Sequence, residues 1–198
     1  MFVTFEGLDG SGKTTQAELL RGRLEAEGRK VVATREPGGT VLGERIRDLL
    51  LHGGHVTPWA EALLYAASRA QHVEEVIRPA LERGEAVVCD RYVDSSAAYQ
   101  GAGRRLGVDR VLDLNLAAVG GLLPDRTFLL LLDPGQAPTR LTGDHDRLER
   151  EGDDFRARVD AGYRELAARF PERIVVLDAT RPPAELAEEV HGSLRVRS

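Results

Sequence analysis

The chain has 198 residues, of which 42% are hydrophobic and 30% charged, and its formal net charge is −5. This length and composition are typical of one globular domain, and a small negative charge without a dense basic segment weighs against a nucleic-acid partner. The single cysteine, Cys89, excludes an internal disulfide and a cysteine-based zinc site, and no apolar run is long enough to span a membrane.

The N-terminus enters an apolar run directly, without the pattern of a signal peptide, so we expect a cytoplasmic protein. Short apolar runs then alternate with helical patterns, and the runs lack the strict alternation of strands that face water on one side. We predict strands at 2–6, 30–35, 86–90, 127–132 and 173–178, and helices near 14–27, 40–52, 58–82, 109–120, 153–170 and 183–195. This order predicts a three-layer α/β fold, a parallel sheet of five strands flanked by helices, and one domain over 1–198.

The most specific motif lies between the first predicted strand and the first predicted helix. Residues 7–14 read Gly-Leu-Asp-Gly-Ser-Gly-Lys-Thr and fit the phosphate-binding loop G-x-x-x-x-G-K-[ST]. Such a loop presents backbone N–H groups to phosphate at a helix N-terminus. Lys13 is then predicted to reach the outer phosphates, and the Thr14 hydroxyl to bind Mg²⁺. The alternative is a Gly-rich turn that closes the strand and helix without a ligand.

Charged residues gather where the predicted strands end, which is the edge at which parallel sheets bind ligands. The run 86–90 ends in Asp90, a candidate outer-sphere partner of Mg²⁺, and Arg91 follows it as a candidate phosphate ligand. For Arg91 the alternative is a surface ion pair. Asp9 lies inside the phosphate loop, where a carboxylate repels triphosphate, so it suggests a phosphoryl acceptor bound close by. The alternative for Asp9 is a side chain that points to solvent.

Two further segments fit a nucleotide site more weakly. Tyr65, Arg69 and His72 share a helical face, where an aromatic ring and an arginine can stack and bind a planar base. A partly buried tyrosine beside a surface arginine explains the same pattern. The segment at about 137–152 places arginines and acidic residues around a glycine, which predicts a lid that brings arginine to the transferred phosphoryl group. A solvated connection between helices is the alternative.

The class of phosphate-loop protein can be narrowed by inspection. GTPases read guanine through N-K-x-D, but the only lysines are Lys13 and Lys30, and Arg29 precedes the second. That motif is therefore absent. A small-molecule kinase remains, as does an ATP-dependent regulator without catalytic activity, which would need an exposed apolar surface for its partner.

Four motifs together resemble the bacterial thymidylate kinases. They are Phe-Glu-Gly-Leu-Asp-Gly-Ser-Gly-Lys-Thr-Thr at 5–15, Thr-Arg-Glu-Pro-Gly-Gly at 34–39, Asp-Arg-Tyr at 90–92 and Ala-Tyr-Gln-Gly at 98–101. The resemblance runs the whole length of the chain. It implies a nucleoside-monophosphate-kinase-like fold, a homodimer, and transfer of the γ-phosphoryl group of ATP to dTMP with Mg²⁺, giving dTDP and ADP in dTTP biosynthesis.

The resemblance also implies roles for individual residues. The ATP phosphates would be held by Gly7, Leu8, Asp9, Gly10, Ser11, Gly12, Lys13, Thr14 and Thr15. The dTMP molecule would be bound by Asp9, Glu36, Arg47, Tyr65, Arg69, Arg91, Ser96, Tyr99 and Gln100. Within this set Tyr65 would stack on thymine, Arg69, Ser96 and Gln100 would contact the base, and Tyr99 would disfavour a 2′-hydroxyl.

The catalytic arginines are expected outside the phosphate loop. Gly10 and Ser11 occupy the loop positions where one class of the family carries arginine, so the resemblance implies the class with arginines in the lid. The expected catalytic residues are Lys13, Asp9, Arg91, Arg147 and Arg140, and the expected metal-binding residues are Thr14, Asp90 and Glu149, the last from a D-x-x-E match that begins at Asp146. A kinase of the same scaffold that acts on another nucleoside or nucleoside monophosphate remains an alternative.

Overall fold

The computed structural model describes residues 1–132, 147–148 and 150–195. Its five strands form one sheet in the order β2-β3-β1-β4-β5, and every neighbouring pair is parallel. The strands are β1 (Phe2–Glu6), β2 (Val31–Arg35), β3 (Ala86–Asp90), β4 (Arg126–Leu131) and β5 (Ile174–Asp178). The predicted five-stranded parallel sheet is confirmed, and each strand end lies within one residue of its predicted position.

The helices follow the strands as expected of an α/β protein. They are α1 (Lys13–Ala26), α2 (Val41–His52), α3 (Pro58–His72), α4 (Arg78–Glu82), α5 (Val93–Ser96), α6 (Val108–Ala118), α7 (Asp153–Arg169) and α8 (Pro183–Arg195), with π-helical segments η1 (Val73–Ile77) and η2 (Ala97–Gly103). The predicted helix 58–82 corresponds to α3, η1 and α4 in succession. In the described part of the chain no helix is long and apolar enough to cross a membrane.

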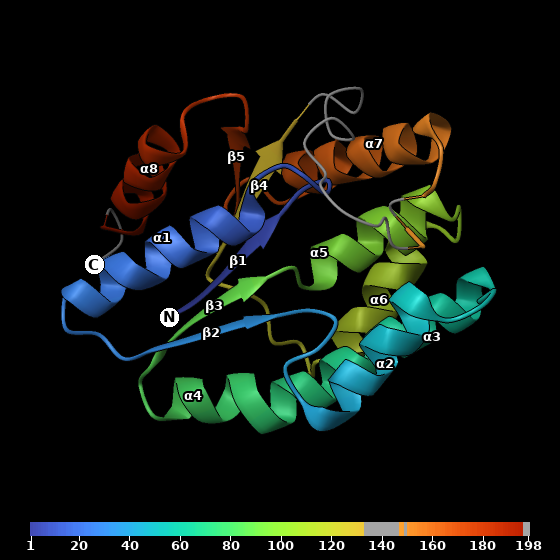
Figure 1. Ribbon diagram of the computed structural model, residues 1–198, viewed down its shortest axis with the longest axis horizontal. Coiled ribbons are helices and arrows are strands. Elements are labelled where there is room, and N and C mark those ends of the chain that lie inside the picture. Colours follow the sequence, from blue (N-terminus) through green and yellow to red (C-terminus); the bar gives the residue numbers. More distant parts are fainter. Residues whose placement is uncertain (133–146, 149, 196–198) are drawn as a thin grey trace.

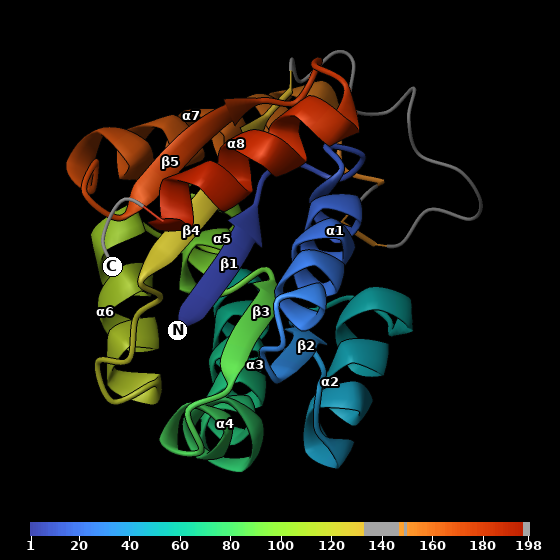
Figure 2. The same ribbon diagram turned by 90° about the vertical axis from the view of Figure 1, so that its left-hand side faces the viewer.

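Helices cover both faces of the sheet (Figures 1 and 2). On one face, α1 and α8 lie side by side, and the α1 residue Leu20 joins Val3, Phe5 and Val88 in the larger hydrophobic cluster. On the other face η1 and α4 pack against alternate strand residues, among them Phe2, Val87 and Cys89. Because both faces of the central strands β1, β3 and β4 are covered, these strands are mostly apolar and buried.

The sequence did not predict the helical turn and π-helical segment that follow β3. Residues 93–103 include Asp94, Ser95 and Ser96 at the start and two glycines near the end, all of which have low helix propensity. The segment is helical because tertiary contacts hold it. Gly103 packs against Phe155 so closely that a Cβ would lie 2.7 Å from its ring, and a Cβ on Gly101 would lie 2.9 Å from the Val108 backbone.

The sheet register brings the loops that follow β1, β2 and β3 to one edge. Phe5 and Arg35 both pair with Asp90, so the chain leaves these three strands at nearly the same height. Backbone hydrogen bonds continue the ladder one step further, from Arg91 N to Phe5 O and from Glu36 N to Asp90 O, both at 2.9 Å. The motifs at 5–15, 34–39 and 90–92 therefore converge in space.

A buried ion pair fixes α5 to the other half of the sheet. Arg173, just before β5, donates from Nη1 and Nη2 to the two carboxylate oxygens of Asp94, at 2.7 and 2.8 Å. Its Nη1 also donates to Thr127 Oγ1 in β4 at 2.8 Å. The Asp94 side chain is 1% exposed. Removing one partner of such a pair leaves an uncompensated buried charge.

We predict that Asp94→Asn lowers the free energy of unfolding by about 3 kcal/mol, because Arg173 loses its bidentate carboxylate in a buried setting. Urea denaturation followed by circular dichroism measures this change. The matched control is Glu74→Gln, which removes the exposed Glu74–Arg78 pair and should cost less than about 1 kcal/mol. Equal losses for the two variants would contradict the structural role of Asp94.

Candidate active site

The loop between β1 and α1 has the backbone of an anion-binding loop. Gly7, Gly10 and Gly12 adopt positive φ angles of 139°, 79° and 93°. A Cβ on Gly7 would collide with the carbonyl oxygen of Leu130, so this position has no room for a side chain. The loop turns on a hydrogen bond from Ser11 N to Leu8 O at 3.2 Å, and α1 begins at Lys13. Backbone N–H groups are thus presented at the start of α1, as phosphate binding requires.

Lys13 folds back over this loop. Its Nζ donates to Leu8 O at 2.9 Å and lies 3.8 Å from Asp9 Oδ1. Burial lowers the pKa of Lys13, and the nearby Arg91 charge adds to this effect, while the carboxylates around it act in the opposite direction. The ammonium group is therefore poorly solvated, which strengthens its attraction for an added anion.

Thr14 and Asp90 form a hydroxyl–carboxylate pair between α1 and the end of β3. Thr14 Oγ1 donates to Asp90 Oδ2 at 2.6 Å. Oxygen donors of this kind suit Mg²⁺, which binds through few protein ligands and completes its shell with phosphate and water. No cluster of three or more His, Cys, Asp or Glu side chains with metal-site geometry occurs among the residues that the structure describes. The donor set fits a metal carried in with a nucleotide, and not a site built from protein ligands alone.

The Asp9 side chain makes polar contacts within the site. It is paired with Arg91, whose Nη2 donates to its Oδ1, and Tyr99 OH donates to its Oδ2 at 3.1 Å. Burial opposes ionisation of Asp9, but the charges of Arg91 and Lys13 outweigh it and lower its pKa to about 2. The alternative that Asp9 is a free surface carboxylate is therefore excluded, as is the alternative that Arg91 makes only an exposed surface pair.

Arg91 lies at the centre of the site in a strained backbone conformation. Its φ angle is +72°, in the left-handed region that costs a non-glycine residue about 1–2 kcal/mol. Its Nη1 donates to Gly7 O at 3.0 Å, Ser95 Oγ at 3.1 Å and Tyr163 OH at 3.3 Å. Contacts from several elements thus fix both the backbone turn and the direction of the guanidinium.

Glu6, the last residue of β1, helps to hold Arg91 and its neighbours in place. Its carboxylate is fully buried and accepts from Tyr92 N at 2.7 Å, Ser95 Oγ at 2.5 Å and Tyr163 OH at 3.0 Å. Two of these donors, Ser95 and Tyr163, also contact Arg91. Burial, with the Asp94 charge second, raises the pKa of Glu6 to about 7, although the Arg91 charge and the hydrogen bonds oppose this shift.

Two hollows meet at Arg91. The first is lined by residues of α3, η2 and the loop after β2, and the second by the phosphate loop, α1 and the ends of β2 and β3. Four residues line both hollows, namely Asp9, Glu36, Arg47 and Arg91. A group bound in one hollow can therefore reach a group bound in the other across these four side chains.

The first hollow brings together the residues that the sequence predicted to bind a nucleotide base and sugar. Its lining includes Tyr65, Arg69, Ser96, Tyr99 and Gln100. Tyr65 and Tyr99 are nearly buried, so the hollow offers aromatic rings as well as polar groups. The structure thus brings α3 and the Ala-Tyr-Gln-Gly motif together at one hollow.

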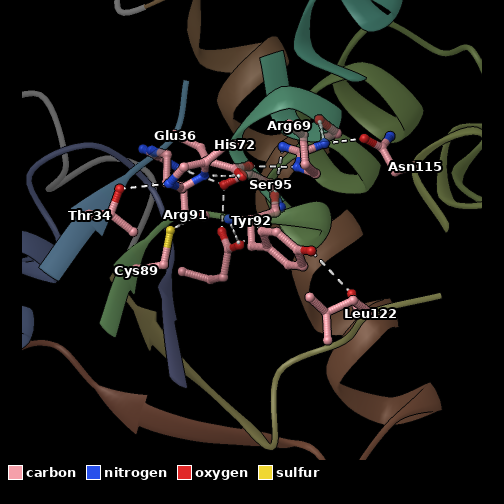
Figure 3. Close-up of polar contacts among 12 residues, drawn as sticks. Thr34, Glu36, Arg69, His72, Cys89, Arg91, Tyr92, Ser95, Asn115 and Leu122 are labelled. Carbon is pink, nitrogen blue, oxygen red and sulfur yellow. Dashed lines mark hydrogen bonds and ion pairs between the residues drawn. The ribbon is translucent and has the colours of Figure 1, made fainter. Parts of the chain in front are cut away.

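Arg69 is held by a buried polar network (Figure 3). Its Nε donates to Glu36 Oε2 at 2.6 Å, and Glu36 Oε1 lies 2.9 Å from His72 Nδ1. Its Nη1 donates to Ser96 and Asn115, and its Nη2 to Tyr92 O. Within the described residues, the second N–H of Nη2 is the donor that remains for a ligand.

Sequence reasoning missed a third hollow on the other side of the phosphate loop. It lies between α1 and the loop after β5, and Ser11, Gly12, Thr15 and Gln16 form one wall. The opposite wall is residues 179–183, with Leu186 beyond them. The available signal was the position of Asp178 at the end of β5, since ligands bind beyond such ends. The sequence Thr-Arg-Pro-Pro at 180–183 carries no motif that would have identified the loop.

Of the predicted arginines Arg47 and Arg147, only Arg47 lines the first two hollows. Arg47 Nη1 donates to Pro37 O at 3.0 Å, next to Glu36, so Arg47 joins the shared wall of the first two hollows. Arg147 lines neither hollow, because its Nε donates to Leu50 O at 2.8 Å and its Nη2 lies 2.7 Å from Glu61 Oε2. Arg140, Asp146 and Glu149 lie outside the described residues, as does most of the predicted lid at 137–152.

Comparison with known proteins gives a consistent result. The sequence profile of the family "Thymidylate kinase" matches residues 5–190. The chain is 56% identical to a thymidylate kinase of Bifidobacterium longum subsp. infantis, over 98% of this chain and 86% of that protein. It is 55% identical to a thymidylate kinase of Clavibacter michiganensis subsp. michiganensis, over 100% of this chain and 94% of that protein. The crystal structure of thymidylate kinase from Ehrlichia chaffeensis superposes with a TM-score of 0.80 at 34% identity, over 98% of both chains.

The raised pKa of Glu6 predicts a pH-dependent stability. An unfolded glutamate titrates near 4.5, so between pH 4.5 and about 7 the folded state holds a proton that the unfolded state releases. Stability conferred by the protonated Glu6 is therefore lost as pH rises through this window. Between pH 5 and 8 the free energy of unfolding of the wild-type protein should fall by on the order of 1–3 kcal/mol more than that of Glu6→Gln, because the amide of the variant cannot titrate.

Urea denaturation of both proteins at a series of pH values measures this difference. Groups that do not interact with Glu6 affect both proteins alike, so the difference between the two curves reports Glu6 together with the charges next to it, Asp94 and Arg91. A difference that stays constant from pH 5 to 8 would show that Glu6 is ionised throughout this range.

Proposed function

The chain belongs to the thymidylate kinase family, and on that premise we propose that residues 7–15 hold the phosphates of ATP while the first hollow holds dTMP. The reaction is transfer of the γ-phosphoryl group of ATP to dTMP, which gives dTDP and ADP. The kinase reading of the sequence is thus confirmed over a non-catalytic regulator and over a kinase for another acceptor.

One observation carries the assignment of the two substrates. Asp9, Glu36, Arg47 and Arg91 line both the hollow at the phosphate loop and the hollow at α3. A phosphoryl donor in one and an acceptor in the other would meet at these side chains. Positioning two reactants in this way supplies a large part of the catalysis of phosphoryl transfer, because the protein has little covalent chemistry to do.

Phosphoryl transfer also requires positive charge near the transferred group. Lys13 of the phosphate loop and Arg91 after β3 both pair with Asp9 Oδ1, next to the backbone N–H donors of the loop. Their charges offset the charge that spreads over the phosphoryl oxygens in the transition state. Asp9, with its low pKa, stays ionised and accepts hydrogen bonds that orient its neighbours. We therefore assign it no role as a general base.

We assign Mg²⁺ to the Thr14 and Asp90 pair. Thr14 would supply its hydroxyl oxygen as a ligand, and Asp90, which accepts a hydrogen bond from that hydroxyl at 2.6 Å, would hold the outer shell. Mg²⁺ bound there would supply positive charge that offsets the charge of the ATP phosphates. Glu149 remains a predicted metal-binding residue, as it lies outside the described residues.

For dTMP we propose that Tyr65 stacks on the base and that Arg69, Ser96 and Gln100 read its edge. The remaining Nη2 donor of Arg69 suits a base carbonyl. Tyr99, held by Asp9 at 3.1 Å, lies where it would meet the sugar and disfavour a 2′-hydroxyl. Arg91 and Arg47 would bind the phosphate of dTMP, with Glu36 nearby at the sugar or metal.

We place the nucleoside part of ATP in the third hollow. A nucleotide whose phosphates lie in the loop can extend past Gly12 toward residues 179–183, away from the acceptor hollow. Arg181 in that wall has a guanidinium that can stack on a purine face. Gln16 adds a buried amide carbonyl without a hydrogen bond among the described residues, which can accept from a nucleotide amino group.

Arg140 and Arg147 remain predicted catalytic residues, although Arg147 in this structure contacts Glu61.

We propose a homodimer that packs through α3 and α6, and the exposed Trp59 and Leu63 on α3 support this choice. A cytoplasmic location remains an expectation from the sequence.

We predict that Lys13→Ala lowers kcat by on the order of a thousandfold or more, because the transition state loses a charge clamp on its phosphoryl oxygens. A coupled assay of ADP release with saturating dTMP measures this. The control is Lys30→Ala, the other lysine of the chain, whose side chain is exposed and should leave kcat unchanged. A Lys13→Ala enzyme that keeps a tenth of wild-type turnover would refute the assignment.

We predict that Tyr65→Ala raises the KM for dTMP about tenfold or more and leaves the KM for ATP nearly unchanged, because only the acceptor base loses its stacking surface. Initial rates with each substrate varied in turn measure both constants. Tyr65→Phe keeps the ring and should retain the wild-type KM for dTMP. If Tyr65→Ala weakened both substrates equally, the base would not lie against Tyr65.

A further inference from the structure

Glu61 is a fully buried carboxylate whose role is not explained by the reaction described above. It lies in the first turn of α3, and its side chain is 0% exposed. A carboxylate so placed is costly unless its charge is paired. Arg104, at the end of η2, donates to it from Nε and Nη2 at 3.2 Å, and Arg147 Nη2 lies 2.7 Å from its Oε2. Two guanidinium groups therefore balance the Glu61 charge.

Gln100 is the third partner of Glu61. Its Nε2 donates to Glu61 Oε1 at 2.8 Å, and the same side chain lines the first hollow. A carboxylate held by two arginines accepts hydrogen bonds and has none to donate. The Gln100 amide must therefore turn its nitrogen toward Glu61. Its carbonyl oxygen, which makes no hydrogen bond within the described part of the chain, is left as the atom for a ligand.

This orientation gives the first hollow a defined pattern of donors and acceptors. Gln100 offers a carbonyl acceptor, and Arg69 offers the second N–H of its Nη2. Thymine and uracil present the complement, an N3–H donor beside a C4 carbonyl. Cytosine reverses both groups, with an N3 acceptor beside a C4 amino donor. A cytosine base would thus face its acceptor toward an acceptor and its donor toward a donor.

We propose that Glu61 is a positioning residue for base specificity, which locks the Gln100 amide with its carbonyl toward the base and so selects thymine and uracil bases over cytosine. The proposal rests on the placement of the dTMP base in the first hollow. Glu61 itself touches no substrate. Its effect passes through Gln100, because an amide without this partner could rotate its nitrogen toward the hollow and donate to the N3 acceptor of cytosine, which leaves only Arg69 to oppose that base.

The test compares the dissociation constants of dTMP and dCMP by titration calorimetry, in wild-type protein and in Glu61→Gln. An amide at position 61 can donate as well as accept, so it no longer dictates the Gln100 orientation. The ratio of Kd for dCMP to Kd for dTMP should fall by on the order of tenfold or more, the scale set by mispaired polar groups in a binding site. Glu61→Asp keeps the carboxylate and should retain the wild-type ratio.

A matched control separates this effect from a loss of packing. Glu151→Gln removes the other carboxylate that pairs with Arg104 and should leave the ratio unchanged. If Glu61→Gln weakened both nucleotides equally, or destabilised the fold without changing their ratio, Glu61 would be structural and the proposal wrong.

Gln100→Ala keeps the proposal testable if Glu61→Gln does not fold. It should lower the ratio to the level expected of Glu61→Gln, and an unchanged ratio would overturn the proposal. The Tyr65→Ala result distinguishes the two levels of inference. If Tyr65→Ala weakens dTMP while both Gln100→Ala and Glu61→Gln keep the wild-type ratio, the base site stands and only the role of Glu61 fails. If Tyr65→Ala has no effect on dTMP, the base lies elsewhere and the proposed site itself fails.

Discussion

The Asp9 carboxylate pairs with both the Lys13 ammonium and the Arg91 guanidinium, inside a loop whose backbone favours anions. A loop that must bind phosphate gains nothing from a carboxylate unless other charges compensate it. Here two cations do so, and their combined effect exceeds the cost of burial and keeps the pKa of Asp9 near 2. The Asp9 charge is therefore compensated, and its carboxylate accepts hydrogen bonds that hold Arg91 and Tyr99 in place.

The same arrangement recurs one layer deeper, where buried carboxylates hold the arginines of the site. Glu36 fixes Arg69, while Glu6 shares Ser95 and Tyr163 with Arg91. Such buried pairs add little stability, since desolvation offsets most of their attraction. Their effect is geometric, because each guanidinium has one orientation in which its donors are satisfied. An arginine held in this way needs no reorganisation when charge develops on the phosphoryl group.

The sequence predicted the parts of the fold that local pattern determines. Each strand is a short apolar run, and the phosphate loop needs Gly7 and Gly12 at positions fixed by its own backbone, so both could be identified without tertiary information. Residues 93–103 could not, because serines and glycines there are helical only through packing against Phe155 and Val108. The third hollow was missed for a related reason, since its walls come from α1 and from residues 179–183.

In the site, too, the sequence predicts some features and tertiary contacts determine the others. Asp9, Arg91 and Gln100 lie in motifs, so their residue types and approximate location follow from the sequence. The orientation of a side-chain amide does not, because its nitrogen and oxygen ends differ only in what they contact. For Gln100 that contact comes from Glu61, 39 positions away in the chain. An unmatched polar group in a buried site costs more than a good hydrogen bond gains. Discrimination between bases therefore depends as much on the residue that holds the amide as on the amide itself.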